Sequence, residues 1–150
     1  EILENGEEIT HRSPDQRNFG MVFQGYALFP HMSVLENVIF PLKLRKISKD
    51  ERTRRAKDML DRVGLAAHIA KRPSELSGGQ QQKVSLARAL YKDAPVIIVD
   101  EGTSSMDQES EFLAERALKM EREKGKIIII ISHKERSKLI SDRIYRMENK

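Results

Sequence analysis

Two aliphatic runs on either side of a predicted amphipathic helix constrain the fold of this chain more than any other feature. Val96–Val99 reads VIIV, and Ile127–Ile131 consists of isoleucine alone. Apolar residues between the runs fall at helical spacing over 108–124 and are expected to face inward: Phe112, Leu113, Ala117 and Met120. Short β-branched runs that alternate with such helices are typical of a parallel sheet with helices on both faces. The pattern therefore predicts an α/β fold with a mostly parallel sheet.

The segment 33–92 is predicted to be helical. A capping box pairs a serine with a glutamate or glutamine three residues later, and each side chain caps the backbone N–H of the other. Its spacing occurs three times: Ser33 with Glu36, Ser48 with Glu51 and Ser77 with Gln80. Pro41 is expected to kink or end the first helix, and Gly64 to end the second. A short helix near 134–140 and a last strand near 143–147 complete the prediction.

The composition excludes several classes of protein. There are no cysteines, so a disulfide scaffold and thiolate metal sites are excluded. No apolar run approaches the roughly 20 residues that a membrane-spanning helix needs, and no signal peptide is visible. The net charge of +4 permits an anionic partner. The basic stretch 43–55, however, is better explained as the solvated face of helices than as a nucleic-acid site.

The segment LSGGQ at 76–80 places two glycines directly before a run of strong helix formers. Because Ser77 and Gln80 have capping-box spacing, a helix is predicted to begin here. Glycines leave the backbone N–H groups of a helix start accessible, and the positive end of the helix dipole favours an anion. A phosphate could therefore bind here. Ser-Gly-Gly by itself favours a simple capped turn, because such tripeptides are common.

Polar residues follow the predicted strands where their carboxyl ends meet. Asp100 and Glu101 follow the first aliphatic run, and His133 follows the second. Gln24 follows a shorter predicted strand at 20–23. Ligands of parallel sheets bind at this edge, where Asp100 could hold Mg²⁺ and Glu101 could polarise a water molecule. Each of these residues, taken alone, is also typical of an ordinary strand end.

In this order, the segments resemble the ATP-binding subunit of ABC transporters. The matches are VFQGYALFPHMSVLENV (22–38) to the Q-loop region, LSGGQ (76–80) to the signature, VIIVDE (96–101) to the Walker B strand, SSMD (104–107) to the D-loop and His133 to the switch histidine. The stretch around Gln24 looks most like subunits of importers, although this says little about the transported compound.

The resemblance implies a role for each matching residue. Glu101 is the expected catalytic carboxylate, assisted by His133. Residues expected to contact a nucleotide, in the same chain or in a partner, are Gln24, Ser77, Gly78, Gly79, Gln80, Asp100 and Asp107. Gln24 and Asp100 are also the expected ligands of Mg²⁺, so the expected cofactors are ATP and Mg²⁺.

The resemblance also implies an organisation and partners. Residues 1–150 are expected to form part of a P-loop NTPase-like domain, with an ATP-binding core at 1–24 and 92–150 and an inserted helical subdomain at 25–91. Two such ATPase subunits are expected to close head to tail over two ATP molecules. The other expected partners are transmembrane permease subunits and an extracytoplasmic substrate-binding protein, and no nucleic acid is expected. The protein would lie peripherally on the cytoplasmic side of the inner membrane.

The sequence departs from the family pattern in three places. No P-loop motif GxxxxGK[ST] occurs in it. In the family that motif lies upstream of the Q-loop, so we expect the P-loop strand and helix to be missing here and the chain alone to be inactive. Gly102 stands where the family usually has proline, and glycine is expected to loosen the loop that carries Glu101. Lys134 follows His133 where aspartate is frequent.

Two alternatives stay open. One is a soluble ABC-type ATPase that acts on nucleic acid or ribosomes, although the interval Gly25–Glu75 has no room for the long coiled coil of the DNA-repair members. The other is a truncated relic without catalytic activity, which rests on the absent P-loop.

Overall fold

The computed structural model describes residues 2–4, 6–13, 16–43, 47–133 and 141–145. The elements along the chain, with η for short 3-10 helices, are β1 (Leu3–Glu4), β2 (Glu7–Glu8), β3 (Phe19–Val22), α1 (Val34–Ile39), η1 (Phe40–Leu42), α2 (Lys49–Arg62), η2 (Ala66–His68), η3 (Pro73–Glu75), α3 (Gly78–Tyr91), β4 (Val96–Asp100), α4 (Gln108–Glu123) and β5 (Ile127–Ile131). The predicted last strand is wrong over 143–145, which form no strand. The predicted helix at 134–140 lies outside the described residues.

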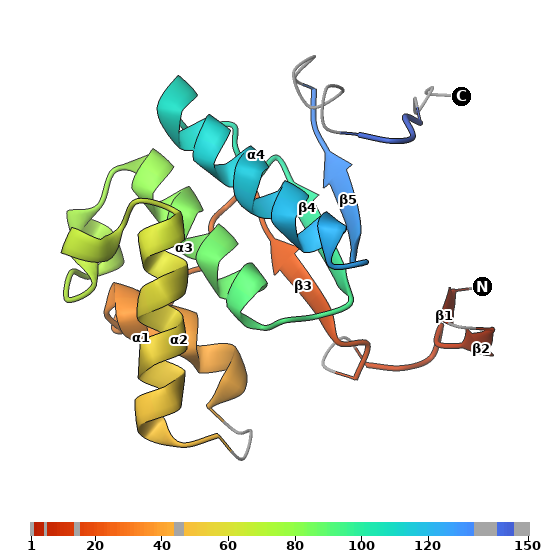
Figure 1. Ribbon diagram of the computed structural model, residues 1–150, viewed down its shortest axis with the longest axis horizontal. Coiled ribbons are helices and arrows are strands. Elements are labelled where there is room, and N and C mark those ends of the chain that lie inside the picture. Colours follow the sequence, from red (N-terminus) through yellow and green to blue (C-terminus); the bar gives the residue numbers. More distant parts are fainter. Residues whose placement is uncertain (1, 5, 14–15, 44–46, 134–140, 146–150) are drawn as a thin grey trace.

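Strands β3, β4 and β5 form a parallel sheet in that order, and β1 pairs with β2 in a separate antiparallel hairpin. Two pairs set the register at the carboxyl end of the sheet. Val22 lies opposite Val99, and Asp100 lies opposite Ile131. Helices α3 and α4 pack on the sheet, and α1 and α2 pack on α3 (Figure 1). The predicted α/β fold with a parallel sheet is confirmed.

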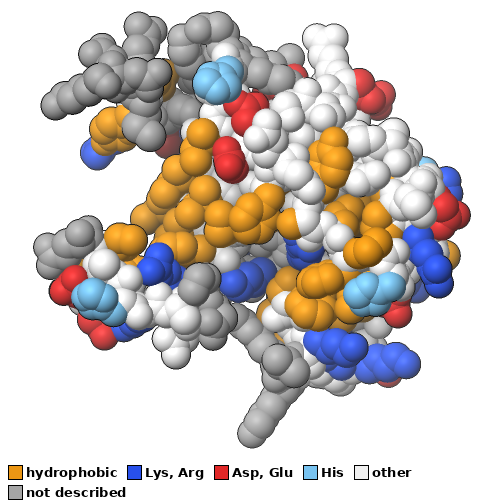
Figure 2. Space-filling view, turned by 180° about the vertical axis from the view of Figure 1, so that it is seen from behind, with side chains coloured by type: hydrophobic (Ala, Val, Ile, Leu, Met, Phe, Trp, Pro, Cys, Tyr) orange, Lys and Arg blue, Asp and Glu red, His pale blue; other side chains and the backbone are white. Residues whose placement is uncertain are grey.

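The two faces of the sheet differ in burial. Val22, Ile97 and Val99 point into the core, and Ile128 and Ile130 pack against them. The opposite face exposes large apolar side chains, namely Met21, Ile127, Ile129 and Ile131. Figure 2 views the molecule from behind and shows hydrophobic side chains gathered across this side. The expected helical cover of the second face is therefore not supplied by the described residues.

The inward side of helix α4 follows its apolar pattern only in part, because Ala117 is buried and Leu113 half-buried as predicted. Phe112 and Met120 are exposed. The buried side chains of this helix are Ser110, Ala114, Ala117, Leu118 and Glu121. Glu121 is 2% exposed and pairs with Lys124 and Lys126. A buried ion pair thus shares the inward side of the helix with Ala114 and Leu118, and hydrophobic periodicity does not register such a contact.

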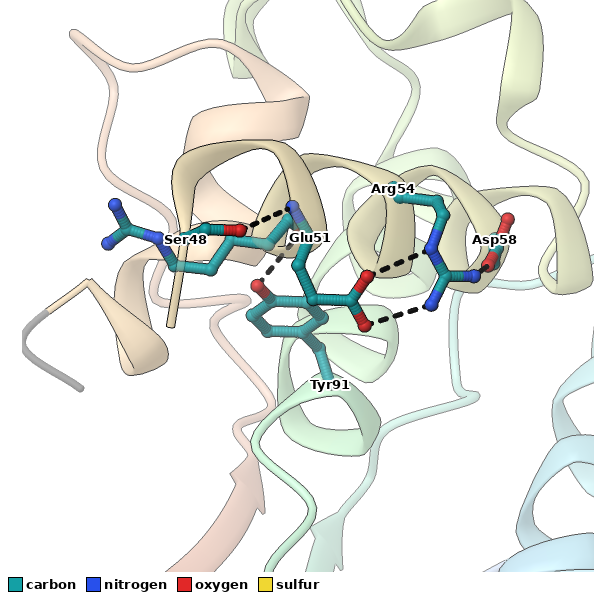
Figure 3. Close-up of polar contacts among 6 residues, drawn as sticks. Ser48, Glu51, Arg54, Asp58 and Tyr91 are labelled. Atoms are coloured by element: carbon teal, nitrogen blue, oxygen red, sulfur yellow. Dashed lines mark hydrogen bonds and ion pairs between the residues drawn. The ribbon is translucent and has the colours of Figure 1, made fainter. Parts of the chain in front are cut away.

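The caps of the helical region follow the sequence prediction with one difference. The capping box of Ser33 is complete, and Ser48 accepts a hydrogen bond from the backbone N–H of Glu51 at 3.3 Å. The Glu51 carboxylate, however, binds the guanidinium of Arg54 with both oxygens (Figure 3). The second box is therefore only half formed. Helix α1 ends directly before Phe40-Pro41, and Gly64, with φ of +70°, follows α2, as predicted.

Candidate functional site

Helix α3 begins where the sequence predicts. Ser77 is its N-cap and accepts from the backbone N–H of Gln80 at 3.3 Å, while Oε1 of Gln80 accepts from the backbone N–H of Ser77 at 3.0 Å. An open pocket of about 400 Å³ lies at this helix start. Its lining residues, here called the helix-start pocket, are Ser77, Gly78, Gly79, Gln80, Lys83, Ser105, Asp107 and Ser110. Four of the predicted nucleotide-contacting residues therefore come together with Asp107 from a distant segment.

The two glycines at this start also allow a close contact between segments. A side-chain carbon on Gly79 would lie 2.8 Å from the backbone oxygen of Ser105, and one on Gly78 would lie 2.9 Å from Oη of Tyr26. Real side chains do not approach backbone oxygen so closely. The glycines thus serve packing as well as access to the backbone, and the sequence interpretation missed the packing part.

The residues that follow the strands meet at one edge of the sheet, as predicted. Because β3 and β4 are in register through Val22 and Val99, Gln24 and Asp100-Glu101 end neighbouring strands. Ile131 is paired with Asp100, which brings His133 next to Glu101. We call Gln24, Asp100, Glu101 and His133 the strand-end cluster.

Within the strand-end cluster, Glu101 has the most defined position. Its Oε1 accepts from the backbone N–H of His133 at 3.1 Å and lies 3.8 Å from Nε2 of the same residue. The Glu101 side chain is 16% exposed, whereas the His133 side chain is fully exposed. Gln24 is exposed as well. The imidazole and the amide are thus free to contact a molecule that approaches this edge.

Gly102 does not loosen the loop in the way the sequence suggests. It is buried, and an added side-chain carbon would lie 2.6 Å from Cγ1 of Val99 and 2.7 Å from Cγ1 of Val22. The neighbouring Glu101 has a left-handed backbone with φ of +49°, a conformation that disfavours a following proline. Glycine therefore permits this backbone to pack directly on the sheet.

Sequence reasoning missed Gln82. Its side chain is fully buried, and it binds three groups of the loop 101–105. Its Nε2 donates to the backbone oxygen of Glu101 at 3.2 Å and to Oγ of Ser104 at 3.0 Å, and its Oε1 accepts from the backbone N–H of Ser105 at 2.9 Å. The signal was present, because Gln82 is a polar residue in helical register with Leu86 and Ala89, which are core residues.

Sequence reasoning also missed Arg88, a second polar residue of α3. It donates to the backbone oxygens of Ala27 at 2.6 Å and of Tyr26 at 3.2 Å, and burial lowers its pKa. Both acceptor residues have positive φ, and Oη of Tyr26 lies 3.2 Å from Oγ of Ser105. Helix α3 therefore holds the segment after Gln24 as well as the loop after Glu101.

The oxygen donors of the strand-end cluster suit Mg²⁺, which takes only part of its ligands from the protein. They do not suit a metal ion that is held by protein side chains alone. Among the described residues, no group of three His, Cys, Asp or Glu side chains could hold a metal ion by itself. Gln24 and Asp100 offer two oxygen donors at neighbouring strand ends. Mg²⁺ commonly takes one or two carboxylates and completes its shell with water and phosphate oxygen.

Comparison with known proteins identifies the class of this chain. The sequence pattern described as "ABC transporter" matches residues 1–104. The chain belongs to the ABC transporter family, in its ATP-binding component. Of the helices in the described part of the chain, none combines the length and apolar character that a membrane crossing requires.

Individual relatives agree with this assignment. The chain is 39% identical over 150 residues to the spermidine/putrescine import ATP-binding protein PotA of Hahella chejuensis, and 42% identical over 139 residues to the ABC transporter ATP-binding protein YtrE of Bacillus subtilis. These matches cover 99% and 88% of the chain but 41% and 60% of the relatives. The chain thus spans about half the length of the curated relatives it matches.

A solved structure gives the same result. It is described as the dimeric, post-hydrolysis state of the ATP-binding cassette MJ0796 bound to ADP and Pi. It matches with a TM-score of 0.80 and 33% identity, over 87% of this chain and 61% of that one. The P-loop NTPase-like fold expected from the sequence is therefore confirmed.

Proposed function

We propose that this chain is part of the ATP-binding and ATP-hydrolysing subunit of an ABC importer. The observation that carries the proposal is the pairing of two features on one α/β frame. The helix-start pocket exposes the beginning of α3, and the strand-end cluster places two carboxylates and a histidine at the sheet edge where ligands bind. The missing P-loop would have to come from sequence outside residues 1–150.

The proposed roles within the strand-end cluster follow from its chemistry. Asp100 and Gln24 would hold Mg²⁺, which supplies charge neutralisation on the phosphates. Glu101 would accept a hydrogen bond from the attacking water and take its proton. His133 would contact the terminal phosphate with its exposed imidazole, since its backbone N–H already holds the Glu101 carboxylate.

The proposed role of the helix-start pocket is to bind a phosphate that a second subunit presents. Backbone N–H groups at Gly78 and Gly79, with Ser77 and Gln80 beside them, would bind the terminal phosphate of ATP held by the partner. Asp107 would lie at the same contact. In this proposal, residues 1–24 and 92–150 form the ATP-binding core, and residues 25–91 form the helical subdomain that carries the helix-start pocket. The dimeric state of the MJ0796 cassette supports a paired arrangement of two subunits.

The proposal includes a position at the membrane. Two ATPase subunits would bind transmembrane permease subunits on the cytoplasmic side of the inner membrane, and an extracytoplasmic protein would deliver the solute. The relative PotA, named for import, supports this direction of transport.

The test uses the full-length protein that carries this chain together with a P-loop. We expect Mg²⁺-dependent release of phosphate from ATP, and dimers that form with ATP and dissociate after hydrolysis, measured by light scattering. Failure to bind ATP, or ATP turnover that requires DNA or ribosomes, would refute the importer assignment.

A further inference from the structure

We propose that Gln82 is a positioning residue for ATP hydrolysis, which fixes the backbone that presents Glu101 and links it to the start of α3. This inference rests on the proposed function, because it assigns Gln82 a part in the reaction of Glu101. Gln82 itself touches neither reacting atoms nor nucleotide, since its side chain is fully buried.

The carboxamide of Gln82 can adopt one orientation in this contact. Its Nε2 faces two acceptors, the backbone oxygen of Glu101 and Oγ of Ser104, and its Oε1 faces a donor, the backbone N–H of Ser105. A flipped amide would set oxygen against the Glu101 carbonyl and N–H against N–H. Three hydrogen bonds in a buried position therefore select one arrangement of the loop.

Glu101 needs such a constraint because its backbone is in the left-handed region, with φ of +49°. The peptide group before Glu101 is fixed by its N–H, which donates to the backbone oxygen of Ile131 at 2.9 Å. The peptide group after Glu101 is fixed through its oxygen by Gln82 at 3.2 Å. With both peptide groups held, the carboxylate is directed to the edge where it meets His133.

The same contact joins the two parts of the site. Gln82 lies five positions after Ser77 on one continuous helix, about 7 to 8 Å along its axis. A helix that shifts when its start binds a phosphate would therefore carry the Gln82 amide, and with it the Glu101 peptide. The geometry links phosphate contact at the helix-start pocket to the position of the catalytic carboxylate in the same chain.

The test compares Gln82→Met with Ser85→Ala in the full-length protein. Methionine keeps the length of the side chain but cannot form the three bonds. Ser85 is a matched control because it is equally buried in α3 and its Oγ has no hydrogen-bond partner in the described part of the chain. We expect Gln82→Met to lower kcat about 10- to 100-fold with KM for ATP within about twofold and ATP-dependent dimers retained. Ser85→Ala should behave as wild type.

Two further measurements separate positioning from general damage. Amide hydrogen exchange at Ser105 should be at least about tenfold faster in Gln82→Met, because its acceptor is gone, and unchanged in Ser85→Ala. Adding Gln82→Met to Glu101→Gln should lower the residual turnover by less than about twofold, since Gln82 acts through Glu101.

If Gln82→Met does not fold, Ser104→Ala removes one of the three bonds without touching the helix, and we expect a smaller fall in kcat with faster Ser105 exchange. Normal kcat in Gln82→Met, or in Ser104→Ala where that variant replaces it, would overturn the inference. The inference would also be overturned if Gln82→Met lowered turnover by the same factor in the wild type and in the Glu101→Gln variant. Absence of ATP turnover in the wild type would instead refute the proposed function, and unchanged Ser105 exchange would then refute the Gln82 contact independently.

Discussion

The helix-start pocket and the strand-end cluster are built in different ways. The helix-start pocket is held in shape by contacts within the chain, because Ser77 and Gln80 cap each other and Gly79 packs on Ser105. In the strand-end cluster, the side chains of Gln24 and His133 are exposed. Contacts within the chain thus shape the helix-start pocket, whereas the strand-end cluster presents exposed side chains to the groups that bind to it. The predictions below test this difference.

The largest effect is expected from Glu101→Gln. The amide keeps the size of the side chain but cannot take a proton from water, so turnover should fall about 10²- to 10⁴-fold. ATP-dependent dimers should persist, because the helix-start pocket is untouched. Phosphate release and light scattering on the full-length protein measure both. The control Glu109→Gln removes an exposed carboxylate of α4 and should leave both unchanged. Turnover near the wild-type rate in Glu101→Gln would contradict its role as base.

Ser77→Arg tests the other region and should have the next largest effect. The long side chain would fill the helix-start pocket, so ATP-dependent dimers should be lost and turnover should fall at least about tenfold. Ser77→Ala separates this from capping, since it removes the cap, at about 1 kcal/mol, but leaves the pocket open. Ser74→Arg places the same charge at an exposed position of η3 and should leave dimers intact. Unchanged dimerisation in Ser77→Arg would contradict a role of the pocket in closure.

Local sequence signals predicted much of both regions. Capping boxes and aliphatic runs depend on neighbours within a few residues, so the starts of α1 and α3 and the strands β4 and β5 could be located from sequence. The parallel arrangement was predicted from these strands as well, and it brings Asp100 and His133 to one edge.

What the sequence did not predict depends on contacts between distant segments. Gln82 and Ser105 are joined only when α3 packs on the loop after β4, and the inward side of α4 includes Glu121, which pairs with Lys126 from the following segment. The conformational freedom of Gly102 was recognised, but its packing on Val22 was not. The roles of the site residues stay predictions until variants are measured.

Gly102→Ala should have a smaller effect, on stability. The added methyl group would meet Val99 and Val22 at 2.6 and 2.7 Å, and overpacking of this kind costs about 1–3 kcal/mol. The free energy of unfolding, measured in urea, should fall by that amount. Gly25→Ala is the control, because its methyl group would contact none of the described residues within 4 Å. Equal stability of the two variants would mean that the loop after Glu101 is not packed on the sheet.

Asp107→Asn should have the smallest effect on the stability of the fold, visible only in acid. The backbone N–H of Ser110 donates to Asp107 at 2.7 Å and, with the Ser110 side chain, lowers the pKa of this carboxyl below its usual 3.8. A lowered pKa means that the charged cap stabilises the fold fully above the unfolded pKa, and that this stabilisation is lost as pH falls through the folded pKa.

Between pH 5 and pH 2, the melting temperature of the wild type should therefore fall more than that of Asp107→Asn, whose amide oxygen still caps α4 at every pH. Circular dichroism at several pH values measures the difference. The control Asp61→Asn removes an exposed charge from α2 and should follow the wild type. Parallel curves for the wild type and Asp107→Asn would show that the charge of Asp107 contributes nothing to the cap of α4, which would then rest on neutral hydrogen bonds alone.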